Sequence, residues 1–404
     1  MGVGSLSNVI KSTEITVKFT PNDTKFLPIT TTCKYPISRK DISENWNRGK
    51  EIVRMGKYRF AIVGTGWRAM YYVRIAEALP EVFELCMMLA RTEDKAKRIR
   101  DEYHVSCTTS EEELLSCKPD FVVVSVAKTV GAEIAMHWLD KGCTVLLETP
   151  AGIDEETLSK LKKRDEQGQK IVVAEQYIRY PQYSALLKLV KKGIIGEVNY
   201  LNISLAHEYH GASLMRALLG INVDTRFSVF SRTYYFPTTE TLTRYEKIED
   251  GRIADKNRTI ALFEFDNGKT ALYEFDSEQY RSPIRKKTYK LQGVRGEIID
   301  NHVYYLDTYN RAAEAELEIE SRVVETHDPN PNLGCFKEIT RISFQGETLY
   351  EPPFGLCGLS DDETAIAMLM KETAEYSRGN GESPYPLQEA LLDAYMAIKM
   401  KKAM

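Results

Sequence analysis

His207 and His210 are the side chains of this chain best suited to moving a proton. An imidazole titrates near neutral pH and can therefore exchange a proton with an alcohol. Residues three apart share one face of a helix, and the sequence around them predicts a helix over 209–219. We expect both histidines to be catalytic, with a structural hydrogen-bonding role as the alternative. Together with Glu208 they could also bind a metal, but no further ligands are evident and we expect no metal.

A glycine-rich turn directly follows the first apolar run, where we expect a strand over 58–63, and precedes a helix expected over 67–79. The turn reads Gly64-Thr65-Gly66-Trp67-Arg68-Ala69. Gly64 permits a tight turn, Gly66 lets the backbone approach a pyrophosphate, and Ala69 lets helix and strand pack closely. Free N–H groups at the start of the helix favour phosphate oxygens. This context predicts a nicotinamide-dinucleotide site formed by the first five residues of the turn, with a ligand-free turn as the alternative.

The end of the second expected strand, 83–89, bears on which dinucleotide is bound. An acid commonly stands there to bind the adenosine ribose, but this chain reads Leu89-Ala90-Arg91-Thr92. The Arg91 guanidinium and the Thr92 hydroxyl suit the 2′-phosphate of NADP. We therefore expect NADP rather than NAD, although Arg91 could instead be solvated or stack on the adenine.

Lys128 follows the strand expected over 121–126, at the end of the sheet where the nicotinamide should lie. A lysine that is desolvated beside a cofactor can act as an acid or base near neutral pH. We expect Lys128 to be both a catalytic and a cofactor-binding candidate. The alternatives are a solvent-facing lysine and one that binds only the ribose of the cofactor.

Short apolar runs alternate with amphipathic stretches in the first part of the chain, which is typical of a parallel sheet covered by helices. We expect strands over 58–63, 83–89, 121–126, 144–147 and 171–174, with helices over 67–79, 94–103, 131–141 and 155–167. The expected fold is an α/β Rossmann domain with a doubly wound parallel sheet.

The second part of the chain changes to alternating apolar and polar residues, as in an antiparallel sheet with one exposed face. A helix over 181–192, a strand over 198–205 and the helix over 209–219 come first. Strands are then expected over 227–236, 259–265, 270–275, 289–293, 297–300 and 303–308, and helices over 361–377 and 387–402.

The resulting prediction is a Rossmann domain followed by an α+β domain with a large, mostly antiparallel open sheet. We expect an N-terminal arm over 1–57, a dinucleotide-binding domain over 58–178, a substrate and oligomerisation domain over 179–380, and a C-terminal helix packing back on the body over 381–404.

The composition excludes several classes of partner. The net charge is only −4 and basic residues are interleaved with acids, so we expect no nucleic-acid partner. No apolar run approaches the roughly 18 residues that cross a bilayer, and no signal peptide is evident, so we expect no membrane partner and a cytoplasmic location. The seven cysteines form no C-x-x-C pair, which argues against a disulfide framework or zinc site; we expect most to be small buried hydrophobes.

The order of these motifs resembles the Gfo/Idh/MocA family, the group of glucose-fructose oxidoreductase and inositol dehydrogenase. The resemblance covers about 58–404 and rests on the glycine turn, Glu148-Thr149-Pro150, Glu175-Gln176-Tyr177, "LVKKGIIGEVNYL" and "PYPLQEALLDAYMAI". It implies reversible hydride transfer between NAD(P) and a carbinol carbon, usually of a sugar, cyclitol or related polyol.

Several positions depart from the motifs of that family. Its members have a lysine, usually catalytic, where this chain has Thr149, and a threonine hydroxyl is a poor general base. Lys128, where the family commonly has asparagine, could supply the missing ammonium. His210 matches the histidine of the family, whereas Ala206 and Ser213 stand where acids are usual.

The resemblance also implies which residues surround the ligands. Glu148 and Thr149 are expected to contact the cofactor. Gln176 and Tyr177 fall where the family lines the substrate pocket, and Tyr209 is expected to join them.

We therefore expect an NAD(P)-dependent oxidoreductase that acts on a small sugar-like substrate and forms homodimers or homotetramers through its antiparallel sheet. One alternative is a redox-neutral glycosidase or epimerase that keeps NAD(H) tightly bound and acts through a transient keto-sugar. The other is a non-catalytic dinucleotide-sensing protein.

Overall fold

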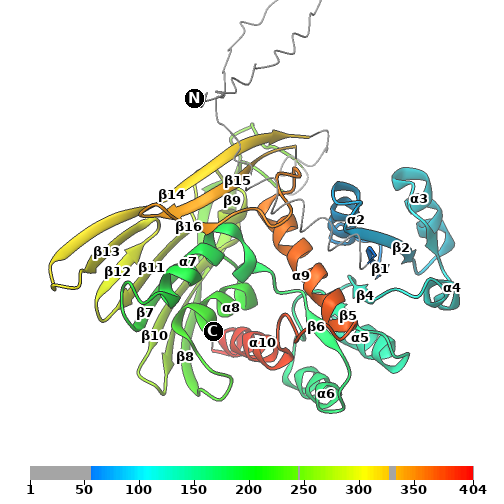
Figure 1. Ribbon diagram of the computed structural model, residues 1–404, viewed down its shortest axis with the longest axis horizontal. Helices are drawn as coiled ribbons and strands as arrows, with labels where there is room; N and C mark the ends of the chain where they lie inside the picture. Colours follow the sequence, from blue (N-terminus) through cyan, green and yellow to red (C-terminus); the bar gives the residue numbers. More distant parts are fainter. Residues whose placement is uncertain (1–55, 244–245, 327–333, 404) are drawn as a thin grey trace, which may run out of the picture. The chain divides into compact units, whose positions relative to one another are not determined.

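The computed structural model describes residues 56–243, 246–326 and 334–403 (Figure 1). The arm expected over 1–57 lies almost entirely outside these residues. Within the described ranges, no helix combines the length and the apolar character needed to cross a membrane.

Among the described cysteines, Cys107 alone is buried, Cys335 is exposed, and the others are partly exposed. The expectation that most cysteines are buried was therefore wrong.

The first sheet is parallel throughout and has the strand order β3-β2-β1-β4-β5-β6. Its strands are β1 (Tyr58–Val63), β2 (Phe83–Leu89), β3 (Cys107–Thr108), β4 (Phe121–Val124), β5 (Val145–Leu147) and β6 (Ile171–Val173). The connecting helices are α2 (Ala69–Ala78), α3 (Glu93–Tyr103), α4 (Glu111–Ser116), α5 (Gly131–Asp140) and α6 (Glu155–Glu166). The doubly wound Rossmann sheet is therefore confirmed.

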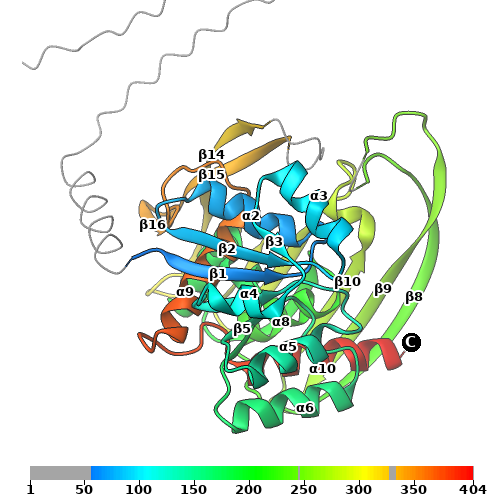
Figure 2. The same ribbon diagram turned by 90° about the vertical axis from the view of Figure 1, so that its right-hand side faces the viewer.

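One strand of this sheet, β3, and one connecting helix, α4, were not predicted from the sequence. A strand of two residues and a helix of six are too short to show a period of their own, and β3 forms only by pairing with the end of β2. The central strands are apolar because they are covered on both faces: every residue of β4, β5 and β6 is buried. Helices α5, α6 and α10 lie side by side against this part of the molecule (Figure 2).

The second sheet has the order β16-β15-β14-β13-β12-β11-β7-β10-β9-β8 within the described residues. Only the pair β7 and β10 is parallel, so the expected mostly antiparallel sheet is confirmed. Its strands are β7 (Val198–Ser204), β8 (Phe227–Thr239), β9 (Ile253–Phe265), β10 (Thr270–Asp276), β11 (Thr288–Gly293), β12 (Gly296–Ile299), β13 (His302–Leu306), β14 (Ala312–Glu325), β15 (Cys335–Phe344) and β16 (Glu347–Tyr350).

Strands β14, β15 and β16 were not predicted from the sequence. The first half of β14 alternates alanine with glutamate, two residues with low strand propensity, so the pattern lacks the β-branched and aromatic residues that mark a strand. Hydrogen bonds to neighbouring strands stabilise these strands instead: β14 pairs with β13 and β15, and β15 pairs with β16.

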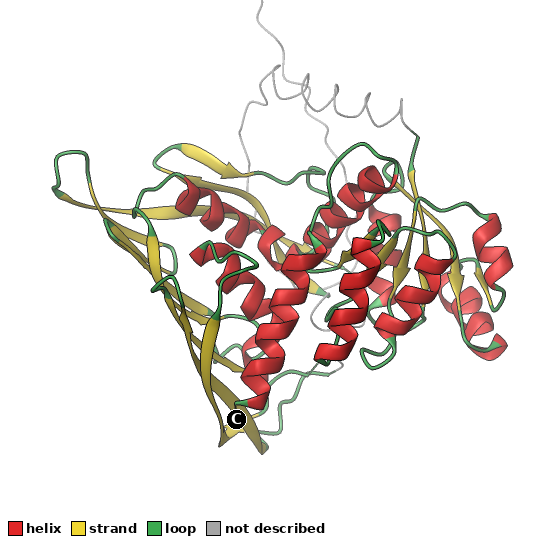
Figure 3. Cartoon of the chain, turned by 90° about the horizontal axis from the view of Figure 1, so that it is seen from below, coloured by secondary structure: helices red, strands yellow, loops and turns green. Residues whose placement is uncertain are grey.

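The remaining helices are η1 (Tyr177–Arg179), α7 (Pro181–Lys191), α8 (Glu208–Leu219), η2 (Ser277–Tyr280), α9 (Asp361–Ser377) and α10 (Leu387–Lys402). Helices α7 and α8 cover one face of the second sheet, and α10 packs on α8 and α6 (Figure 3). Helix α9 instead packs on α2, β1 and β4 of the first sheet.

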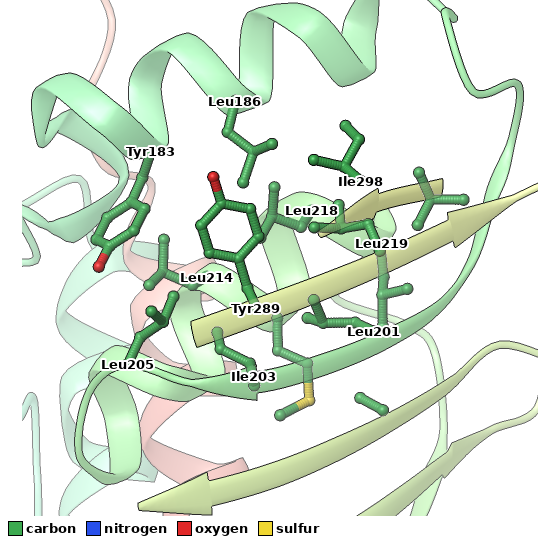
Figure 4. Close-up of a cluster of buried hydrophobic side chains, with 14 of the residues drawn as sticks. Tyr183, Leu186, Leu201, Ile203, Leu205, Leu214, Leu218, Leu219, Tyr289 and Ile298 are labelled. Atoms are coloured by element: carbon green, nitrogen blue, oxygen red, sulfur yellow. The ribbon is translucent and has the colours of Figure 1, made fainter. Parts of the chain in front are cut away.

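A continuous apolar core holds α7 and α8 on the second sheet (Figure 4). Leu201 and Ile203 of β7 meet Leu214 and Leu218 of α8, and all four are almost completely buried. The opposite face of the sheet exposes apolar side chains, and Phe230 is 63% exposed. The subunit contact expected on this sheet stays a prediction.

Gly211 sets how closely α8 approaches β10. A Cβ at this position would lie 2.5 Å from the ring of the buried Tyr273 and 3.0 Å from the backbone oxygen of Ala206. The Tyr273 hydroxyl also accepts a hydrogen bond from the backbone N–H of Glu208, at the start of the helix (2.7 Å). Because Gly211 has no side chain, the start of α8 can lie this close to the sheet.

We expect Gly211→Ala to lower the free energy of unfolding by about 1–3 kcal/mol, because the added methyl overpacks the contact with Tyr273. Urea denaturation measures the change. Gly381→Ala is the matched control, since nothing lies within 4 Å of its added Cβ. Equal stability of the two variants would contradict the close approach of α8 to β10.

Candidate functional site

A cavity of about 530 Å³ lies where the carboxyl ends of β4, β5 and β6 meet the start of α8 and the segment after β10. Its walls therefore come from both sheets. The residues lining it are Trp67, Arg68, Tyr71, Ser125, Val126, Lys128, Glu148, Thr149, Gln176, Tyr177, Tyr180, His207, Tyr209, His210, Tyr280, Arg281, Lys287 and Asp362.

Ten of the fifteen residues expected at the site line this cavity. They are Trp67, Arg68, Lys128, Glu148, Thr149, Gln176, Tyr177, His207, Tyr209 and His210. The other five lie outside it: Gly64, Thr65 and Gly66 form the turn that leads into α2, and Arg91 and Thr92 are exposed before α3. The structure thus brings the expected catalytic and substrate-binding residues together.

The glycine turn has the shape that a pyrophosphate needs. Gly64 has a φ of +120°, and a Cβ there would lie only 2.0 Å from the backbone oxygen of Ser125. Gly66 is exposed, with nothing within 4 Å of a built Cβ. No side chain caps the start of α2, and its first turn contains no acid, so its N–H groups are available to an anion. These residues fit the phosphates of a dinucleotide.

His210 and Glu175 form a buried pair at the end of β6. The Nδ1 of His210 lies 2.6 Å from Oε2 of Glu175, and neither residue is more than 6% exposed. Burial raises the pKa of Glu175 to about 8 and lowers that of His210 to about 3. Both shifts disfavour charge, so near neutral pH the pair holds one shared proton and no net charge. Nε2 of His210 is left without a hydrogen-bond partner among the described residues.

His207 is held differently, because both of its ring nitrogens have tyrosine partners. Nδ1 contacts the hydroxyl of Tyr280, and Nε2 lies 3.1 Å from the hydroxyl of Tyr209. Burial, reinforced by His210, lowers the pKa of His207 to about 3. His207 therefore connects tyrosines from two sides of the cavity rather than presenting a free nitrogen.

Arg68 connects the glycine turn to α9 and β5. Its Nε donates to Oε1 of Glu148 (2.9 Å), and its Nη1 donates to Oδ2 of Asp362 (2.6 Å). The hydroxyl of Tyr72 donates to the same Glu148 oxygen (2.6 Å). Although burial alone would raise the pKa of Asp362, the charge and hydrogen bond of Arg68, with bonds from Gln176 and Tyr180, hold it below its usual value. The carboxylates of Glu148 and Asp362 therefore already accept hydrogen bonds from the protein.

Gln176 presents an unused acceptor to the cavity. Its Nε2 donates to Oδ1 of Asp362 (2.7 Å), which fixes the orientation of the amide. Its Oε1 is buried and has no hydrogen-bond partner among the described residues. A buried acceptor without a partner is costly, so a ligand N–H or O–H at this point would be stabilising.

The two lysines of the cavity differ in their surroundings. Lys128 is exposed, so the desolvation that we expected of it is absent from the protein alone. Lys287, in the segment between η2 and β11, keeps contact with solvent while its ammonium lies 5.5 Å from the centre of the Tyr280 ring. Partial desolvation by the surrounding protein lowers the pKa of Lys287, although Asp362 and Asp361 oppose this.

Sequence reasoning assigned no role to Glu175, Tyr280, Lys287 or Asp362. For Glu175 a signal existed, since a carboxyl group directly after an apolar strand stands at the edge where ligands bind in such sheets. The other three come from segments without a motif, and only packing brings them to the cavity.

Comparison with known proteins agrees with this geometry. Residues 58–218 match the family model GFO_IDH_MocA, described as "Oxidoreductase family, NAD-binding Rossmann fold". An uncharacterized oxidoreductase, ORF334 of Rhizobium meliloti, is 27% identical over 149 residues, which are 36% of this chain and 44% of that relative. The matched segment thus spans less than half of the length of that relative.

Solved structures share the fold at low sequence identity. An NAD binding oxidoreductase from Klebsiella pneumoniae has a TM-score of 0.57 and 16% identity, covering 86% of this chain and 97% of that one. Biliverdin reductase from Synechocystis has a TM-score of 0.55 and 15% identity, with coverages of 86% and 98%. A UDP-N-acetylglucosamine 3-dehydrogenase from Acidithiobacillus ferrooxidans has a TM-score of 0.52 and 12% identity, with coverages of 86% and 97%.

We expect the Glu175→Gln variant to change how stability depends on pH. The folded pKa of about 8 lies above the ordinary value of 4.5, so the stability contributed by the bound proton is complete below pH 4.5 and is lost as pH rises through 8. Glutamine does not titrate. The stability of the wild type relative to the variant should therefore fall as pH rises from about 4.5 to 8.

Urea denaturation across this range measures the difference, and Glu81→Gln, at an exposed glutamate, is the control that should follow the wild type. Parallel pH profiles for wild type and Glu175→Gln would show that Glu175 does not hold a proton in the folded protein.

Proposed function

We propose that this chain transfers a hydride between NAD(P) and a carbinol carbon, because residues 58–218 match the model of the Gfo/Idh/MocA oxidoreductases with its NAD-binding Rossmann fold. The proposed substrate is a sugar, glycoside or cyclitol, as the resemblance implies. The folds shared with a biliverdin reductase and a sugar-nucleotide dehydrogenase do not choose between substrate classes.

One observation carries the proposal. The cavity is walled on one side by residues that follow the Rossmann strands, Ser125 and Glu148, and on the other by His210 of α8. Ligands of open α/β sheets bind at this end of the strands. A dinucleotide whose pyrophosphate lies on the glycine turn would therefore direct its nicotinamide toward a side chain that can exchange a proton.

We propose that His210 moves the proton and that Glu175 stores it. Bound NAD(P) would exchange the hydride with the carbinol carbon, while the hydroxyl proton is exchanged with the protein. When Glu175 is protonated, it donates to Nδ1 of His210, so Nε2 carries the N–H that can protonate a carbonyl oxygen. For alcohol oxidation the proton moves the other way, onto Nε2, while the Nδ1 proton passes to the Glu175 carboxylate.

Other cavity residues receive supporting roles in this proposal. Thr149 and Tyr209, which both line the cavity, would donate hydrogen bonds to substrate oxygens. Gln176 offers its unpaired Oε1 to a substrate hydroxyl or to the carboxamide of the nicotinamide. Lys128, at the end of β4, would bind the cofactor's ribose and become desolvated only when the cofactor covers it.

The function is tested by mixing the protein with NAD⁺ or NADP⁺ and a panel of sugars, glycosides and cyclitols, and following the absorbance of reduced nicotinamide. We expect net reduction of the cofactor with at least one polyol. Turnover with no net change and cofactor retained through gel filtration would instead show the redox-neutral glycosidase or epimerase. Binding of cofactor with no hydride exchange would show a dinucleotide sensor.

Alcohol oxidation should speed up as pH rises through about 8, because Glu175 must lose its proton before it can accept another through His210. Glu175→Gln should lower kcat by about 10²–10⁴-fold and remove this step from the pH profile. The affinity for NADPH, measured by fluorescence, should stay unchanged. A variant that keeps the wild-type profile would contradict the storage role of Glu175.

Arg91 tests which dinucleotide is preferred. Arg91 is exposed just before α3 and forms no ion pair with a described residue, so it is available to a 2′-phosphate. Arg91→Ala should raise the Kd for NADP about tenfold and change the Kd for NAD by less than about twofold. Arg98→Ala, at an exposed arginine within α3, is the matched control. Equal weakening of both cofactors would leave no role for Arg91 in choosing NADP.

A further inference from the structure

We propose that the substrate carries a carboxylate, which Lys287 binds at the end of the cavity beside Tyr280, and that the preferred substrate is therefore a sugar acid rather than a neutral sugar. This inference rests on the proposed function and adds the substrate class. Lys287 would be a binding and specificity residue and would take no part in the proton transfer.

The carboxylates that line the cavity have partners other than Lys287. Four cations face two carboxylates: Arg68, Lys128, Arg281 and Lys287 against Glu148 and Asp362. Both carboxylates are already engaged, since each accepts from Arg68 and each has a further hydrogen-bond donor. Neither of these carboxylates is paired with Lys287, so its ammonium can bind a ligand anion, although the negative charges of Asp362 and Asp361 act on it through space.

Lys287 is the cation best placed to bind such an anion. No carboxylate of the described residues lies within 4.0 Å of its ammonium. Its nearest described partner is the ring face of Tyr280, which orients an ammonium but leaves N–H donors unused. Desolvation lowers the pKa of Lys287, Asp362 and Asp361 raise it, and the like charge of Arg281 lowers it by a smaller amount. An incoming carboxylate would offset both the desolvation of Lys287 and its repulsion by Arg281.

The position of Lys287 places this anion near the reacting groups. The hydroxyl of Tyr280, whose ring Lys287 faces, accepts a hydrogen bond from the backbone N–H of His207 (2.9 Å) and contacts its Nδ1. Tyr177, which also lines the cavity, stacks on His210 with ring centroids 4.3 Å apart. A substrate held by Lys287 would thus extend over these aromatic rings toward the two histidines.

Lys128 does not fit this role as well. It follows β4 on the Rossmann side, and it also lines a second, smaller cavity with Glu208 and Tyr209. Lys287 lies in the segment between η2 and β11 and lines the first cavity. In this proposal Lys128 therefore serves the cofactor and Lys287 the substrate acid. The unpaired Oε1 of Gln176 supplies the acceptor that a sugar hydroxyl requires.

The test uses the full-length protein saturated with NADPH and isothermal titration with matched pairs that differ only in the carboxylate: D-glucuronate and D-glucose, and D-galacturonate and D-galactose. We expect the acid of at least one pair to bind about tenfold more tightly than its neutral partner, as one charge-assisted contact allows. Lys287→Met should reduce this ratio to within about twofold. Lys286→Met, at the neighbouring exposed lysine outside the cavity, should preserve it.

Equal affinity for the acid and the neutral sugar in both pairs would overturn the inference. A preference for the acid that persists in Lys287→Met would also overturn the inference. So would wild-type protein that binds NADPH but binds no sugar and no sugar acid of either pair. Failure of the wild-type protein to bind NADPH would be a different result, because it would overturn the proposed function itself. Retained NADPH binding in Lys287→Met shows that this variant is folded.

Discussion

The buried contact between Glu175 and His210 is the constraint on which the site depends. A carboxyl group and an imidazole are costly to bury separately, because each loses the water that solvates its charge. Placed 2.6 Å apart, Nδ1 of His210 and Oε2 of Glu175 share one proton in a hydrogen bond, and the pair carries no net charge. This contact exists only if the end of β6 and the first turn of α8 stay in register.

A second buried network holds α8 in that register. Arg216, on the same helix, donates through Nε to Asp393 of α10 (2.9 Å) and through Nη2 to the hydroxyl of Tyr385 (2.7 Å). Burial raises the pKa of Asp393 to about 7 although Arg216 opposes the shift. Removing one partner of a buried ion pair is strongly destabilising, because it leaves the other charge without compensation. The C-terminal helix thereby helps to position His210 without touching the cavity.

Arg68 ties the cofactor side of the cavity to α9. It stands in the glycine turn but bonds Glu148, which follows β5, and Asp362, in the first turn of α9. Asp362 in turn orients Gln176. The turn that is proposed to hold the pyrophosphate and the amide that faces the ligand are therefore coupled through a single carboxylate.

The sequence by itself determined the Rossmann sheet, the glycine turn at Gly64 and the spacing of His207 and His210, because each is a local pattern of period, turn chemistry or helix geometry. It did not show β14, whose alanine and glutamate residues become a strand only through pairing with neighbours. Tertiary structure alone decided that Tyr280 and Lys287 reach the cavity. Such contacts join residues far apart in the chain, and their formation depends on strand order and helix packing, which no local pattern encodes.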